Sequence, residues 1–149
     1  MLLTDPVDSW QIEVVSAVQD ACKENPALAH VSFRYPERDT ATLAVRFGET
    51  LLGFAHGHQA RDLVKWWNGQ SIGRTPVGDA DVLITAHYHH FQVKQVGSRL
   101  WLQVPALDGG SPWFRDAQGL EAPSGLLSFV VGDGYDVRKD LAILSGESR

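Results

Sequence analysis

Two short apolar runs, each followed at once by histidines, constrain this chain more than any other feature. Residues 51–55 lead into His56-Gly57-His58, and residues 82–86 lead into His87-Tyr88-His89-His90. Short, continuous apolar runs are typical of buried β-strands. Five of the chain's six histidines fall into these two clusters. Because imidazole is the commonest metal ligand among side chains, the sequence predicts a metal site where two strands end.

The composition permits a small enzyme domain and argues against several other classes of protein. With 149 residues and 44% hydrophobic content, the chain can bury one core, and we expect one domain. A net charge of −5 argues against non-specific binding to nucleic acid or to an anionic membrane. No apolar stretch approaches the roughly 20 residues of a membrane span. The single Cys22 excludes an intramolecular disulfide and predicts a reducing, cytoplasmic setting.

The expected organisation is one helix followed by a mostly β body. A helix is predicted over residues 5–25, because Asp5-Pro6 favours a helix start, apolar residues recur at helical spacing, and Asn25-Pro26 ends the run. The β body is predicted over residues 31–132 and a loose charged tail over 133–149. Within the body we expect strands at 31–35, 42–47, 50–55, 82–85, 91–96, 100–104 and 126–131, a helix at 60–67, and loops at 68–80 and 107–125.

The two histidine clusters resemble the last two metal-binding motifs of the calcineurin-like metallophosphoesterase superfamily. Those motifs are a strand-terminal His-Gly, here His56-Gly57, and a later Gly-His-x-His, here Ala86-His87-Tyr88-His89. Residues 105–113 resemble the segment after the last motif in phage-encoded members. The resemblance covers about residues 5–132. It implies an α/β (α+β) fold, namely the C-terminal half of a metallophosphoesterase-type β-sandwich flanked by helices.

The superfamily's first three motifs do not occur in this sequence. They are Asp-x-His, Gly-Asp-x-x and Gly-Asn-His-Asp or Glu, and they supply half or more of the metal ligands. Gly78-Asp79 is a Gly-Asp pair in the wrong order, and we interpret it as a turn. Ala86 stands where the last motif has glycine. The resemblance therefore implies one half of a metallophosphoesterase, either split or truncated.

The resemblance also implies a role for each clustered histidine. His56 and His87 are expected to bind one metal ion and His89 the other, and His87 and His89 are the catalytic candidates. His58 and His90 lie one ligand spacing further along, where contacts with the ligands or with a phosphate are expected. The complete family site holds two divalent ions, for which Mn, Zn, Fe and Ni all suit such ligands. Such a pair activates a water for attack on a phosphate ester.

Three functions stay open from the sequence. In the first, the chain is part of a phosphoesterase, a hydrolase of phosphomonoesters or phosphodiesters such as nucleotides, and a partner chain or a second copy supplies the missing ligands. In the second, it is a catalytically inactive module that retains the scaffold and binds nucleotides or a partner. In the third, three histidines hold a single metal and leave the fourth position to water, which makes a one-metal hydrolase.

Overall fold

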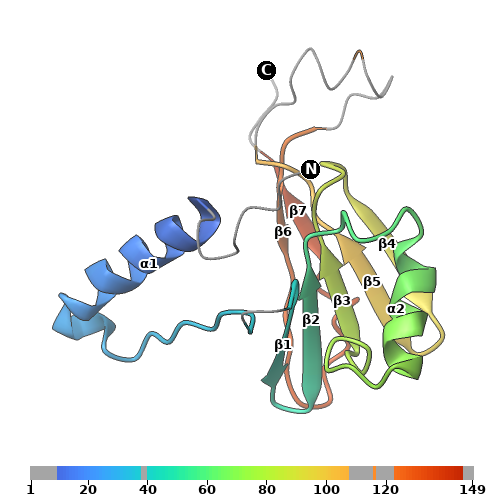
Figure 1. The fold of residues 1–149 in the computed structure, drawn as a ribbon, viewed down its shortest axis with the longest axis horizontal. Coiled ribbons are helices and arrows are strands. Elements are labelled where there is room, and N and C mark those ends of the chain that lie inside the picture. Colours follow the sequence, from blue (N-terminus) through green and yellow to red (C-terminus); the bar gives the residue numbers. More distant parts are fainter. Residues whose placement is uncertain (1–9, 38–39, 108–115, 117–122, 146–149) are drawn as a thin grey trace. The chain divides into compact units, whose positions relative to one another are not determined.

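The computed structural model describes residues 10–37, 40–107, 116 and 123–145, drawn as coloured ribbon in Figure 1. The chain separates into two compact units, residues 1–40 and 41–149. The organisation as one domain stays a prediction. In the described ranges, no helix is long and apolar enough to cross a membrane.

The first unit contains helix α1 (Trp10–Lys23) and a short 3-10 helix, η2 (Pro26–Leu28). The Asn25 side chain caps η2 by accepting a hydrogen bond from the Ala27 N–H at 3.0 Å, as short polar side chains do at helix starts. The Tyr35 hydroxyl donates to Gln19 Oε1 on α1 at 3.0 Å. The predicted strand at 31–35 is wrong, because these residues have no regular secondary structure and pair with no neighbouring strand.

The second unit is built on a five-stranded mixed sheet with the order β1-β2-β3-β5-β4. Its strands are β1 (Thr42–Phe47), β2 (Thr50–Ala55), β3 (Val82–Thr85), β4 (Gln92–Val96) and β5 (Arg99–Gln103). Strands β2, β3 and β5 run parallel to one another, while β1 and β4 pair antiparallel at the two edges. The predicted hairpin of β1 and β2 is confirmed, and Gly48 takes the left-handed φ of 55° that its turn requires.

Helix α2 (Leu63–Ile72) covers one face of this sheet and connects β2 to β3. Its Leu63 and Trp67 are buried against Leu83 and Trp101 of the sheet. The opposite face packs beneath a two-stranded antiparallel sheet of β6 (Leu126–Ser128) and β7 (Ala142–Leu144), together with the residues that connect them. These layers confirm the predicted mixed α/β fold.

Helix α2 runs further than the predicted range 60–67. Asp62 caps its start by accepting from the Lys65 N–H at 2.9 Å, and Gly73 closes it with an N–H bond to Gly69 O. Asn68-Gly69, the predicted stop, lies inside the helix. The helix continues because Arg99 on β5 donates to Asn68 Oδ1 at 2.8 Å and so fixes this turn against the sheet.

The C-terminal residues also differ from the prediction of a loose charged tail over 133–149. Within that range, the apolar run Ala142–Leu144 forms β7 and pairs with β6. Strand β6 ends at Ser128, earlier than predicted. Most of the predicted loop at 107–125, and with it most of the phage-type segment at 105–113, lies outside the described residues.

Candidate metal centre

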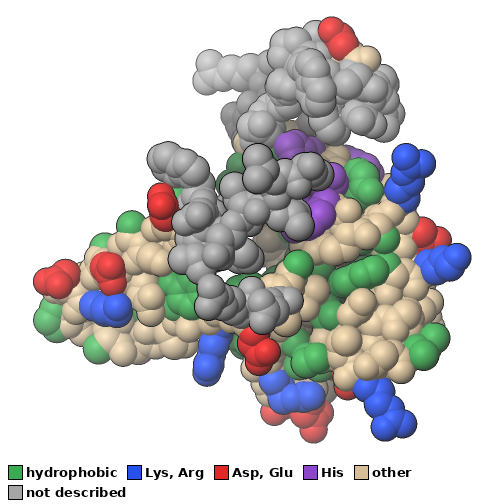
Figure 2. Space-filling model, in the orientation of Figure 1, with side chains coloured by type: hydrophobic (Ala, Val, Ile, Leu, Met, Phe, Trp, Pro, Cys, Tyr) green, Lys and Arg blue, Asp and Glu red, His purple; other side chains and the backbone are tan. Residues whose placement is uncertain are grey.

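The two histidine clusters meet at one end of the sheet, where the parallel strands β2 and β3 finish. His56 follows β2 and His87 follows β3, and these strands are parallel neighbours with Ala55 opposite Thr85. The carboxyl ends of parallel strands lie at the same edge of a sheet, where ligands commonly bind. Figure 2 shows the histidine side chains gathered in one place on the surface. The neighbouring ends of β2 and β3 therefore bring His56 and His87 together, where the sequence predicted a site.

The loops that carry these histidines are joined through their backbones. The Ala86 N–H donates to the His56 carbonyl at 3.0 Å. Gly57 has φ of 108°, and a Cβ atom at this position would lie 2.7 Å from the Ala86 carbonyl oxygen. Only glycine therefore allows the first loop to approach the second this closely.

Three imidazoles converge at this junction. His56 Nε2 and His87 Nδ1 are 3.1 Å apart, which is hydrogen-bonding distance for a ring N–H and a neutral ring nitrogen. The ring of His58 lies 5.3 Å from that of His56 and 6.2 Å from that of His87, between centroids. All three residues are exposed. A dissolved ion can reach them without any opening of the fold.

The electrostatics of the cluster favour neutral imidazole. Partial desolvation of the His56 ring is the largest cause that lowers its pKa below the ordinary value, although the residue as a whole is exposed. Repulsion from His87, His58 and His89, in that order, lowers this pKa further. A neutral imidazole is the form that binds metal, so His56 is held in the ligand-competent state over a wider pH range.

The second loop has an unusual backbone. His87 and His89 both lie in the left-handed region, with φ of 75° and 56°. This conformation costs a non-glycine residue about 1–2 kcal/mol and recurs at functional sites. Ala86 is not among the left-handed residues, so the alanine that replaces the motif's glycine fits here. The strain therefore falls on the two predicted catalytic residues.

Buried side chains beneath the loop support it. The Trp101 indole N–H donates to Thr85 Oγ1 at 2.9 Å, and Gln103 Nε2 donates to the His90 carbonyl at 2.9 Å. His90 itself turns toward its own loop, with Nδ1 2.8 Å from the Tyr88 carbonyl. The sequence analysis did not find Gln103. A lone amide in the apolar run of β5 was the available signal, and only the strand register shows what it reaches.

The residues present fit part of a metal site. Two nitrogens bound to one tetrahedral zinc at about 2.0–2.1 Å lie about 3.3 Å from each other, close to the 3.1 Å between His56 Nε2 and His87 Nδ1. Among the described residues, however, no group of three or more His, Cys, Asp or Glu could hold an ion. His89 is near enough to influence the pKa of His56 but completes no such group. The described part thus brings together one pair of candidate ligands, His56 and His87.

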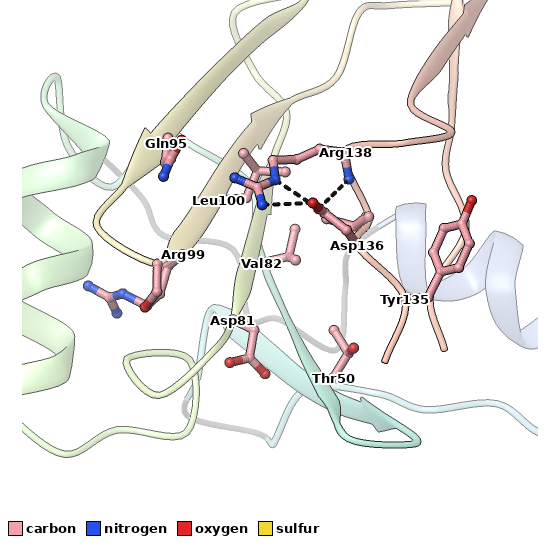
Figure 3. A pocket seen from close by; sticks show the side chains of 11 residues that line it. Thr50, Asp81, Val82, Gln95, Arg99, Leu100, Tyr135, Asp136 and Arg138 are labelled. Atoms are coloured by element: carbon pink, nitrogen blue, oxygen red, sulfur yellow. Dashed lines mark hydrogen bonds and ion pairs between the residues drawn. The ribbon is translucent and has the colours of Figure 1, made fainter. Parts of the chain in front are cut away.

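A second polar region lies at the opposite end of the sheet, where β3 and β5 begin (Figure 3). A cavity of about 160 Å³ is floored by Val82 and Leu100, where β3 and β5 begin. Asp136 and Arg138 form its wall, joined by two side-chain hydrogen bonds of 2.8 and 2.7 Å. These bonds, and a third from the Arg138 backbone N–H, lower the pKa of Asp136 to about 2. The sequence analysis predicted nothing at this edge.

Comparison with known proteins identifies the fold. No protein-family model matches the sequence, and no curated protein sequence matches it. The crystal structure of Vps29 from Chaetomium thermophilum is similar with a TM-score of 0.50 at 18% identity, over 62% of this chain and 48% of that one. Vps29 from Entamoeba histolytica, solved in complex with Zn²⁺, gives a TM-score of 0.48 at 23% identity, over 69% and 54%.

A predicted phosphoesterase from Streptococcus pneumoniae has a TM-score of 0.39 at 17% identity, over 54% of this chain and 43% of that one. At such identities the similarity shows the fold alone. The chain has a mixed α/β fold like that of Vps29 from Chaetomium thermophilum. It spans about half the length of the two Vps29 structures.

Proposed function

We propose that this chain carries part of the metal centre of a metal-dependent phosphoesterase. The observation that supports this proposal most directly is the convergence of His56 and His87 at the end of two parallel strands. In the proposed site His56, His87 and His89 are the metal ligands of this chain. A divalent ion there would polarise a phosphoryl oxygen and lower the pKa of a bound water.

We further propose that the remaining ligands come from elsewhere. Among the described residues, His56 and His87 bring ring nitrogens within 3.1 Å of each other, but no group of three or more possible ligands could hold an ion. A two-metal site needs carboxylates, which the absent Asp-x-His and Asn-His motifs would bring. A partner chain or a second copy is the proposed source. The metals in question are Mn, Zn, Fe or Ni, since imidazole with carboxylate suits each of them.

The reaction proposed for the completed site is hydrolysis of a phosphomonoester or phosphodiester, of which a nucleotide is one example. His87 and His89 would contact the ester near its leaving oxygen, because both residues are exposed in the loop that follows β3. The cytoplasmic setting is proposed on the single Cys22 alone.

One observation favours a second function, that of a catalytically inactive binding module. In the part of the chain that the structure describes, a complete set of ligands is lacking. A protein that has lost its metals while retaining the scaffold would have this arrangement. Such a module would bind a nucleotide or a protein partner with the same exposed edge of the sheet.

Metal content separates the two functions. The purified chain is incubated with Mn²⁺ or Zn²⁺, desalted and examined by elemental analysis, beside His87→Ala and His89→Ala. His30→Ala is the matched control, because His30 lies in the first unit. We expect metal in the wild type and in the control, and its loss in the other two variants. Hydrolysis of bis-p-nitrophenyl phosphate is then assayed. Absence of metal from the wild type would favour the binding module over a metal centre that a second copy of this chain completes.

A further inference from the structure

Gln103 is the most deeply buried amide side chain near the histidines. It ends β5 directly beside the end of β3, opposite Thr85, and only 1% of it is exposed. The residues before it, Trp101 and Leu102, fill the core on the two faces of the sheet. An apolar side chain would fill this position at less desolvation cost, so the burial of an amide needs a reason.

The contacts of Gln103 and its neighbour provide that reason. Gln103 Nε2 donates to the His90 carbonyl at 2.9 Å, and the Val104 N–H donates to the Thr85 carbonyl at 2.8 Å. Thr85 and His90 are the two ends of the loop that carries His87 and His89. Gln103, the last residue of β5, and Val104, which follows it, therefore hold both ends of this loop.

We infer that Gln103 is a positioning residue for the metal centre, an inference that rests on the proposed function. The two histidines between the fixed ends occupy left-handed conformations that they would leave if the loop relaxed. The hydrogen bond to the His90 carbonyl restricts the loop backbone, so His87 and His89 cannot move to a less strained conformation. Gln103 thereby keeps His87 beside His56 without contacting the metal or the ester.

Substitutions that remove only the donor test this inference. Gln103→Met keeps the length of the side chain and loses the hydrogen bond. Gln103→Asn keeps an amide but is one methylene too short to reach His90, so it serves if the methionine variant does not fold. The matched control is Gln95→Met on β4, because the exposed Gln95 amide donates to the Gly97 carbonyl in the neighbouring turn.

Two measurements are made on the folded proteins. Zn²⁺ affinity is measured by isothermal titration with zinc alone, and hydrogen exchange of residues 86–91 is followed by mass spectrometry without metal. We expect both Gln103 variants to bind zinc at least about tenfold more weakly, as for other residues that orient metal ligands. Their loop should exchange faster while α2 exchanges at the wild-type rate, which separates loop relaxation from loss of global stability.

Each outcome decides one of the two proposals. If the wild type binds zinc and the Gln103 variants bind it equally well, the inference is overturned and the proposed metal centre stands. If the wild type binds no zinc, a metal centre completed by a second copy of this chain is overturned, and the exchange of residues 86–91 alone decides the inference. Unchanged exchange in that loop then overturns it, and faster exchange confined to the loop supports Gln103 as its anchor.

Discussion

The two ends of the central sheet use polar side chains in opposite ways. Where β2, β3 and β5 begin, carboxylates accept hydrogen bonds from the backbone. Asp81 accepts from the Leu51 N–H at 2.7 Å, and Asp133 accepts from the Glu49 N–H at 2.7 Å. Where β2 and β3 end, His56 and His87 are exposed and bring ring nitrogens within 3.1 Å, and His87 lies in a strained, left-handed conformation.

The difference separates groups that stabilise the fold from groups that are available to a ligand. A carboxylate that caps a backbone N–H satisfies a donor that would otherwise cost free energy. A left-handed histidine costs free energy, and proteins tolerate this mostly where function requires it. The histidine end is therefore the better candidate site, even though the other end contains the cavity described above. Four substitutions test this contrast.

The largest expected effect is at the carboxylate end, in Arg99→Ala. The Arg99 guanidinium donates to Ser71 Oγ and Gly78 O, each at 2.8 Å, and lies 4.0 Å above the centre of the Trp67 ring. Loss of these contacts should lower the free energy of unfolding by about 2–3 kcal/mol, measured by urea denaturation. Zinc affinity should not change. A parallel loss of zinc binding would show that the two ends are not independent.

Gly57→Ala should have the next largest effect, and at the histidine end. It places a Cβ 2.7 Å from the Ala86 carbonyl oxygen at a φ of 108°. We therefore expect the free energy of unfolding to fall by about 1–3 kcal/mol and zinc binding to be lost. Gly134→Ala is the control, because Gly134 is also left-handed but has open space around it. If both variants bind zinc equally, contact between the two loops is not required.

Replacing a strained histidine by glycine should stabilise the fold while removing function. His89→Gly relieves the left-handed φ of 56° and should raise the free energy of unfolding by up to about 1 kcal/mol, with loss of zinc binding. Arg74→Gly, at a φ of 54° just beyond α2, should stabilise similarly and bind zinc normally. Destabilisation by His89→Gly alone would mean that this histidine supports the fold.

The smallest effect is expected for Asp136→Asn at the carboxylate end. Hydrogen bonds from Arg138 lower the pKa of Asp136 from 3.8 to about 2, so the ionised carboxylate stabilises the folded state above pH 3.8. This contribution is lost as pH falls through about 2. The wild type should therefore unfold at a slightly higher temperature than the variant at pH 7, and at the same temperature near pH 2. A difference that persists at pH 2 would exclude the charge as its cause.

The sequence predicted the short strands and, through the family resemblance, the pairing of His56 with His87. The structure brings these two side chains together, because β2 and β3 are parallel neighbours. The β1–β2 hairpin was predicted from Gly48 between two short runs. The short strands and the hairpin depend on residues that are close in the sequence, so the sequence pattern was sufficient to predict them.

Contacts that depend on register between distant segments could not be predicted. Gln103 reaches His90 because β5 pairs with β3 in one register, which the amino-acid pattern does not encode locally. Asn68 looked like a helix stop, but Arg99, 31 residues away, holds it inside α2. Ala142–Leu144 lies in the range predicted as a loose charged tail, but it forms β7 because it pairs with β6.

The bond between the Ala86 N–H and the His56 carbonyl has a consequence for the order in which this fold assembles. It joins positions that the chain brings together only after α2 has crossed back and β3 has aligned beside β2. Such non-local closure is slow compared with formation of a hairpin or a helix. The imidazole pair therefore comes into being late in folding. An ion that needs both rings would bind the folded chain and not partly folded chains. The rate at which it binds during refolding would therefore report the rate of the last folding step.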